Sequence, residues 1–316
     1  MFRIALLFLA FSTSLSAISI DAKEYLEFAL STMEEGSVNR RYVDWAELRS
    51  RVYDKAGDAQ TPADTYEAIS LALELLGDNH SFFMTPGQVA DLATSSGSNI
   101  DKIHSRLIGN NIGYISIPGC WTCDDEAMTQ FAHKIQDAIQ TLDQHDLNRW
   151  IIDLRENFGG TMAPMFVGLS SLLDTNVVGY FGDERVLTNC WIVEDGALKL
   201  GEYEWLNMKR APYTIKNRSP YIAILLSGNT ASSGEATAIA FLGQKNVYTF
   251  GQKTAGATSA NELIELPDGA CFLLATIYEL DRLKRVYRSG ITPDAEMADS
   301  EAALPAATEW LKLVSY

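Results

Sequence analysis

The segment Tyr221–Glu235, YIAILLSGNTASSGE, decides the fold because a strand, a turn and a helix start follow one another within it. The apolar run 221–226 predicts a buried strand, and the small polar residues 227–229 predict a turn. Ser232 then opens an apolar helix. In α/β proteins ligands bind at this edge, beyond the carboxyl ends of parallel strands. Ser232 is therefore a candidate nucleophile, with neighbouring N–H groups available to hold an oxyanion.

The same segment has a purely structural interpretation. Ser232 with Glu235 three residues later also forms the pattern of a capping box, which only closes the start of a helix. This segment alone does not decide between the two interpretations, so the rest of the chain must.

Composition restricts the class of protein. The 316 residues are 47% hydrophobic and 21% charged, which is typical of a globular protein with one large domain or two smaller ones. The formal net charge of −16 argues against nucleic acid and anionic membrane surfaces as partners. The sequence gives no evidence for a metal or an organic cofactor, and none for an oligomeric state.

The first residues have the pattern of an export signal. Arg3 precedes the apolar run IALLFLAF and the small residues SLSA, which predicts a signal peptide over residues 1–17 with cleavage after Ser16 or Ala17. The run is short for a membrane span. We expect a periplasmic or secreted protein with no span after cleavage, and an uncleaved anchor is the alternative.

The four cysteines are Cys120, Cys123, Cys190 and Cys271. In an oxidising compartment some of them could pair. Cys120 and Cys123 form a C-x-x-C motif, whose alternatives are a redox pair, half of a zinc site or a local disulfide. No second C-x-x-C or histidine pair completes a zinc site, so we favour a structural role or none.

The periodicity divides the chain into two parts. Helical patterns dominate residues 18–106, which predicts an N-terminal helical domain. Residues 107–316 alternate strands with helices, which predicts an α/β core of mostly parallel strands. Residues 176–220 look like an inserted antiparallel piece, and residues 261–280 like a hairpin with Pro-Asp-Gly at its turn.

Two further segments could converge on Ser232. The strand WIIDLR ends in Asn157-Phe158-Gly159-Gly160, where glycines let a peptide carbonyl approach backbone N–H groups. His80 lies in a loop after a helix, next to two phenylalanines, and is a candidate general base. Each segment also has a purely structural interpretation: residues 157–160 could be an ordinary glycine turn, and His80 could be a non-catalytic loop histidine.

Seven motifs occur in an order that resembles a known family. They are DNHSFF, IGYISIP, IIDLRENFGG, LLSGNTASSGEA, GQKTAGATSA, LPDGA and GITPD. The chain resembles the tail-specific (C-terminal processing) serine peptidases, whose core resembles the crotonase (ClpP/crotonase) fold. The resemblance covers about His80 to Asp294 and the helical part before it.

The resemblance implies roles for individual residues. Ser232 matches the nucleophile of the family's T-A-S-x-x-E pattern, and Ser233 with Gly159 or Gly160 matches its oxyanion-hole donors. The processing branch uses a Ser-Lys dyad, but this chain has Ala257 at the lysine position, and Lys253 matches an earlier lysine that is not the base.

A second departure is the missing PDZ module, because the stretch from Met84 to Asn111 is too short to contain one. Both departures favour a tricorn-like branch that uses serine, histidine and an acid. His80 matches that histidine, while Asn79 replaces a serine that helps to orient the site. For the acid we choose Asp281, with Glu279 as the alternative.

We therefore expect an exported serine endopeptidase that acts on a peptide or protein substrate through an acyl-enzyme. A catalytically inactive peptide- or ligand-binding protein on the same fold is the main alternative. A hydratase acting on thioesters is disfavoured by the export signal, because coenzyme A substrates are cytosolic. A structural protein that binds through its helical part is the remaining alternative.

Overall fold

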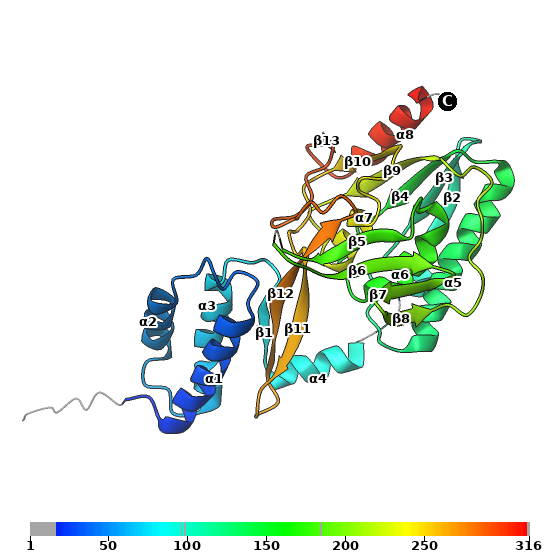
Figure 1. Cartoon of the computed structure of the whole chain (residues 1–316). Coiled ribbons are helices and arrows are strands. Elements are labelled where there is room, and N and C mark those ends of the chain that lie inside the picture. Colours follow the sequence, from blue (N-terminus) through cyan, green and yellow to red (C-terminus); the bar gives the residue numbers. More distant parts are fainter. Residues whose placement is uncertain (1–16, 96, 98, 184, 315–316) are drawn as a thin grey trace, which may run out of the picture.

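The computed structural model describes residues 17–95, 97, 99–183 and 185–314 (Figure 1). The predicted signal peptide therefore lies outside the described residues, except for Ala17. Within the described ranges no helix is long and apolar enough to cross a membrane.

The described residues form helices and strands with the following bounds. The helices are α1 (Ile20–Gly36), α2 (Trp45–Ala56), α3 (Tyr66–Leu75), α4 (Pro86–Ser95), α5 (Asp125–Leu142), α6 (Met162–Leu169), α7 (Ser233–Ile239) and α8 (Ala303–Leu313). The strands are β1 (Phe82–Met84), β2 (His104–Ile108), β3 (Ile112–Ser116), β4 (Arg149–Asp153), β5 (Val177–Gly182), β6 (Leu187–Glu194), β7 (Ala197–Leu200), β8 (Tyr203–Asn207), β9 (Tyr221–Leu226), β10 (Val247–Gly251), β11 (Ser259–Glu265), β12 (Cys271–Asp281) and β13 (Ala295–Glu296).

One sheet has the predicted parallel character. Its order is β13-β10-β9-β4-β3-β2, and only β2 runs antiparallel to its neighbour. Strands β4 and β9 are neighbours, with Ile152 opposite Ile224. Their carboxyl ends therefore meet at one edge of the sheet, where the chain continues into the Gly159–Gly160 turn and the Ser232 turn.

The second sheet corrects the expectation of mostly parallel strands. Its order is β1-β12-β5-β6-β7-β8, β11 also pairs with β12, and every pairing is antiparallel. Short connections such as the turn at residues 266–270 can join only antiparallel strands. The inserted antiparallel piece and the β11–β12 hairpin are both confirmed.

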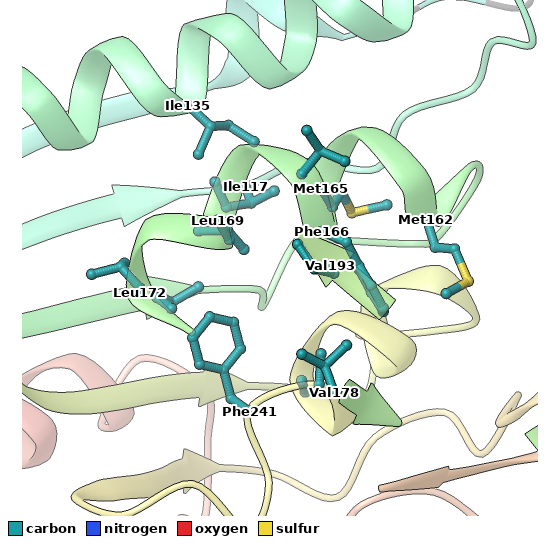
Figure 2. Close-up of a cluster of buried hydrophobic side chains, with 14 of the residues drawn as sticks. Ile117, Ile135, Met162, Met165, Phe166, Leu169, Leu172, Val178, Val193 and Phe241 are labelled. Carbon is teal, nitrogen blue, oxygen red and sulfur yellow. The ribbon is translucent and has the colours of Figure 1, made fainter. Parts of the chain in front are cut away.

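Helix α6 lies at the centre of the main hydrophobic core. All eight of its residues are buried, as expected for a helix that is apolar on every side. Figure 2 shows Met165, Phe166 and Leu169 of this helix beside Val178 and Val193 of the antiparallel sheet. The core therefore joins the two sheets and fixes their relative position.

The N-terminal helices share a second core with β12. Leu26, Met33 and Ile69 pack in one cluster with Phe272 and Leu274. Figure 1 shows β1, β12 and β11 running between helices α1–α3 and the rest of the molecule. The domain boundary between residues 106 and 107 stays a prediction. Helices α1 and α3, which precede it in the sequence, pack on strand β12, which follows it.

Candidate active site

A cavity of about 490 Å³ lies where the two sheets meet. It brings together His80, Ser232, Ser233 and Gly160, which come from distant parts of the sequence, and it does not include Asp281. Its other polar lining residues are Asn79, Ser259, Asn261 and Glu279, and its large apolar ones are Phe82, Trp121, Phe158, Met162, Phe181, Trp205 and Leu273. A larger cavity of about 760 Å³ is lined by helix α2, by the loop that joins α1 to α2 and by residues 288–289. It contains none of the predicted site residues.

Ser232 is held in a strained backbone conformation at the start of α7. Its φ of +53° and ψ of −124° lie outside the regions that a serine ordinarily adopts. Such strain persists only where the surroundings hold it, and it concentrates at functional sites. The side chain is half-buried and lines the cavity, as a nucleophile on a sharp strand-to-helix turn does.

Glu235 fixes this turn. The capping box is present, and the backbone N–H of Ser232 donates to Glu235 Oε2 at 3.0 Å. The carboxylate also accepts the N–H of Ala257 on Oε2 at 2.8 Å, the N–H of Gly256 on Oε1 at 2.9 Å and the hydroxyl of Thr254. Burial raises the pKa of Glu235, and these four donors oppose that rise. The capping interpretation is thus correct but incomplete, because the same carboxylate ties the Ser232 turn to residues 254–257.

The backbone at Gly159 and Gly160 lies so close to Ser232 and Cys120 that a side chain would not fit at either glycine. A Cβ atom on Gly159 would lie 2.8 Å from Ser232 Cβ, and one on Gly160 would lie 2.2 Å from the Cys120 carbonyl oxygen. Both glycines have φ near +100°, a conformation that L side chains rarely adopt. The glycine turn therefore lies directly against Ser232.

The backbone N–H groups next to Ser232 differ in whether they already have a hydrogen-bond acceptor. The N–H of Gly159 donates to Asn157 Oδ1 at 3.0 Å. Within the described part of the chain, the N–H groups of Gly160 and Ser233 have no hydrogen-bond acceptor. The Ser233 hydroxyl donates to the Gly160 carbonyl at 2.5 Å, which holds these two residues side by side. Gly160 and Ser233 are therefore the pair with free N–H groups.

Three contacts position His80. Asp78 Oδ1 accepts its backbone N–H at 2.9 Å, and Asn261 Nδ2 donates to its carbonyl at 3.0 Å. Nδ1 of the imidazole lies 3.0 Å from Ser259 Oγ, so Nε2 is left for a second partner. Burial lowers the pKa of His80 below its usual value, and the charge of Asp78 opposes this. Asn79 does not take part, since its side chain donates to the Ala255 carbonyl.

The structure does not bring Asp281 to His80. The Asp281 carboxylate is fully buried and accepts hydrogen bonds from Arg285 Nε at 2.6 Å and the Tyr287 hydroxyl at 2.9 Å. None of its hydrogen bonds in the described residues involves the histidine. Glu279, the alternative acid, does line the cavity, but its carboxylate has no partner among the described residues.

Sequence reasoning missed Ser259 and Asn261, which contact the His80 loop. The contact joins residues 179 positions apart, and it exists because β11 pairs with β12 beside that loop. Neither residue type is distinctive in a strand, so no local signal identifies them.

The position of a dyad lysine holds a small side chain here. Ala257 lines the cavity, whereas Lys253 is exposed and lies outside it. Among the described residues no lysine or arginine lines the cavity, so His80 is the nitrogen base that it offers.

Among the described residues no cysteine lines this cavity. All four cysteines are free thiols, and Cys120 is buried beside the glycine turn, where its N–H donates to the Gly159 carbonyl at 3.1 Å. This position agrees with a structural role for Cys120. No group of three or more metal-ligating side chains is present in the described ranges.

Comparisons with known proteins show the family of the chain. The model of the family described as "Peptidase family S41" matches residues 111–297. The nisin-resistance protein of Lactococcus lactis subsp. lactis is 28% identical over 291 residues, which are 92% of this chain and 87% of the relative.

Two solved structures are also similar. A lipoprotein from Streptococcus agalactiae has a TM-score of 0.72 at 25% identity, covering 98% of this chain and 99% of the other. The photosystem II D1 C-terminal processing protease has a TM-score of 0.59 at 15% identity, covering 90% and 94% of the two chains, which is a likeness of fold.

Proposed function

The chain belongs to peptidase family S41, and from that premise we propose that it is a serine endopeptidase with Ser232 as its nucleophile. The observation that carries the proposal is the meeting of Ser232, His80 and two free N–H groups at one cavity. We also propose that the core carrying these groups has the crotonase-like fold. The same proposal divides the chain into an N-terminal helical domain, residues 18–106, and a peptidase core domain, residues 107–316.

In the proposed mechanism Ser232 Oγ attacks a peptide carbonyl while His80 Nε2 takes its proton. The N–H groups of Gly160 and Ser233 hold the oxyanion, and we assign no donation to Gly159, because Asn157 already accepts its N–H. His80 then gives the proton to the leaving amine, and water hydrolyses the acyl-enzyme. An oxyanion donor is typically worth about 3–4 kcal/mol in the transition state.

In this proposal Ser259, and not Asp281, orients the imidazole of His80. Its hydroxyl is the group that contacts His80 Nδ1, at 3.0 Å, whereas Asp281 is engaged by Arg285 and Tyr287. A hydroxyl contributes less to the basicity of an imidazole than a carboxylate does. We therefore expect slower turnover than a histidine with a directly paired acid would give.

We further propose that the protein works outside the cytoplasm. The pattern of residues 1–17 supports export, and the similar structure from Streptococcus agalactiae is that of a lipoprotein. The substrate is a peptide or protein in that compartment.

A serine-reactive phosphonate tests the assignment. We expect it to label the wild-type protein at Ser232, and we expect no labelling of Ser232→Ala at that site. Ser50→Ala, which changes an exposed serine of α2 outside the cavity, is the matched control and should be labelled like the wild type. If the folded wild-type protein remains unlabelled at Ser232, the non-catalytic binding protein becomes the better account.

A further inference from the structure

One acidic side chain in the cavity has no role in the mechanism above. Glu279 lies on β12, is 3% exposed and lines the cavity. Its Oε2 is buried and has no hydrogen-bond partner among the described residues. A buried carboxyl oxygen without a partner is costly in a folded protein, so each such group requires an explanation.

The surroundings of Glu279 are apolar on one side and acidic on the other. Phe181 lies directly opposite it on β5, so the two side chains share one face of the sheet and both line the cavity. Burial raises the pKa of Glu279 well above its ordinary value, and the charge of the Glu235 carboxylate adds to this rise. No lysine or arginine of the described chain lines the cavity to compensate.

We propose that Glu279 recognises a lysine or arginine side chain of the substrate, bound in the cavity beside Ser232. This inference rests on the proposed function, because it names the substrate class of the same site. Lysine and arginine offer only hydrogen-bond donors, which is what an unpaired acceptor oxygen requires. An opposite charge in contact with the carboxyl group would also favour its ionised form.

The apolar lining suits the stem of such a side chain. Lysine and arginine bury their methylene groups along apolar surface and keep the charged end at a polar group. Phe181 and Trp205 line the cavity, and aromatic faces also attract cations. The net charge of −16 would draw cationic peptides toward the protein before they bind.

The other unpaired acceptor of the cavity is a separate feature. Asn261 Oδ1 is buried and has no partner among the described residues, but Asn261 pairs with Ala275, four residues from Glu279 on β12. At about 3.4 Å per residue these positions lie roughly 14 Å apart along the strand. One ammonium group therefore cannot reach both, and the charge recognition belongs to Glu279.

Neutral isosteres of the two basic residues test the proposal. Fluorogenic peptide libraries would carry lysine or norleucine, and arginine or citrulline, at one position at a time. We expect one position where the wild-type enzyme shows at least a tenfold higher kcat/KM for the basic residue. Glu279→Gln should abolish that preference while turnover of the norleucine peptides stays within about threefold. The matched control Glu262→Gln, an exposed residue of β11, should keep the preference.

A binding measurement separates this proposal from the proposed function. The same peptides would be bound to the Ser232→Ala protein, where no turnover is needed. A preference for the basic peptides that disappears in Ser232→Ala/Glu279→Gln supports the proposal even if no hydrolysis is found. The absence of any preference for the basic residue at every position would overturn it. An equal loss of turnover on basic and neutral peptides in Glu279→Gln would also overturn it and would make Glu279 a positioning residue.

Discussion

The two sheets contribute to the cavity in different ways. The parallel sheet supplies main-chain groups at its carboxyl edge, where Ser232 and the glycine turn are held by a dense set of hydrogen bonds. The antiparallel sheet supplies polar side chains, namely Ser259, Asn261 and Glu279. Asn261 and Glu279 each keep a buried oxygen that has no partner in the described part of the chain.

This difference separates chemistry from recognition. Groups that stabilise an oxyanion must be in place before the reaction, so a turn held rigid by surrounding hydrogen bonds suits them. Groups that recognise a substrate need acceptors that the protein itself leaves unused. We therefore expect changes at the parallel edge to lower kcat, and changes on the antiparallel wall to alter which substrate is used.

The largest expected effect is that of Ser232→Ala. Removing the nucleophile should lower kcat by about 10⁴-fold or more, because only binding and oxyanion stabilisation remain. Steady-state hydrolysis of a fluorogenic peptide measures it, with circular dichroism to check the fold. Full activity in the variant would show that the parallel edge does not supply the nucleophile.

Gly160→Ala should have the next largest effect. The added methyl group would meet the Cys120 carbonyl at 2.2 Å, and the turn would have to move. Loss of one oxyanion donor typically lowers kcat by about 10²–10³-fold. Gly228→Ala is the matched control, because a Cβ there meets nothing within 4 Å. Equal kcat values for the two variants would contradict the role given to the Gly160 N–H.

Glu235→Gln tests whether the Glu235 carboxylate holds the Ser232 turn against residues 254–257. The amide nitrogen would face N–H donors, which should lower the free energy of unfolding by about 1–3 kcal/mol. Urea denaturation measures this, and the exposed Glu262→Gln should stay within about 0.5 kcal/mol of wild type. We also expect a lower kcat with little change in KM. Wild-type stability in Glu235→Gln would mean that the four hydrogen bonds do not hold the turn.

The smallest expected effect concerns pH. Burial lowers the pKa of His80 from its usual value of 6.5, so the neutral base persists below that pH. The acid limb of the kcat/KM profile should therefore have its midpoint below pH 6.5. Asp78→Asn removes the charge that raises this pKa and should move the midpoint lower still. A midpoint above 6.5 in the wild type would contradict the lowered pKa of His80.

The sequence predicted the parallel edge better than the antiparallel wall. A strand, a turn and a helix start are local patterns, so Ser232 and the glycine turn could be identified from neighbouring residues. Ser259 could not, because its contact with His80 depends on how a distant hairpin packs. Asp281 illustrates the opposite problem. Its position at a strand end suggested a free carboxylate, but Arg285 and Tyr287, four and six residues later, satisfy it locally.

The most direct test of the account is a crystal structure of the protein after reaction with a peptide phosphonate. We predict a covalent bond to Ser232 Oγ, a phosphonyl oxygen within hydrogen-bond distance of the Gly160 and Ser233 N–H groups, and His80 Nε2 facing the adduct. An adduct on another residue, or an imidazole turned away from it toward solvent, would contradict the account.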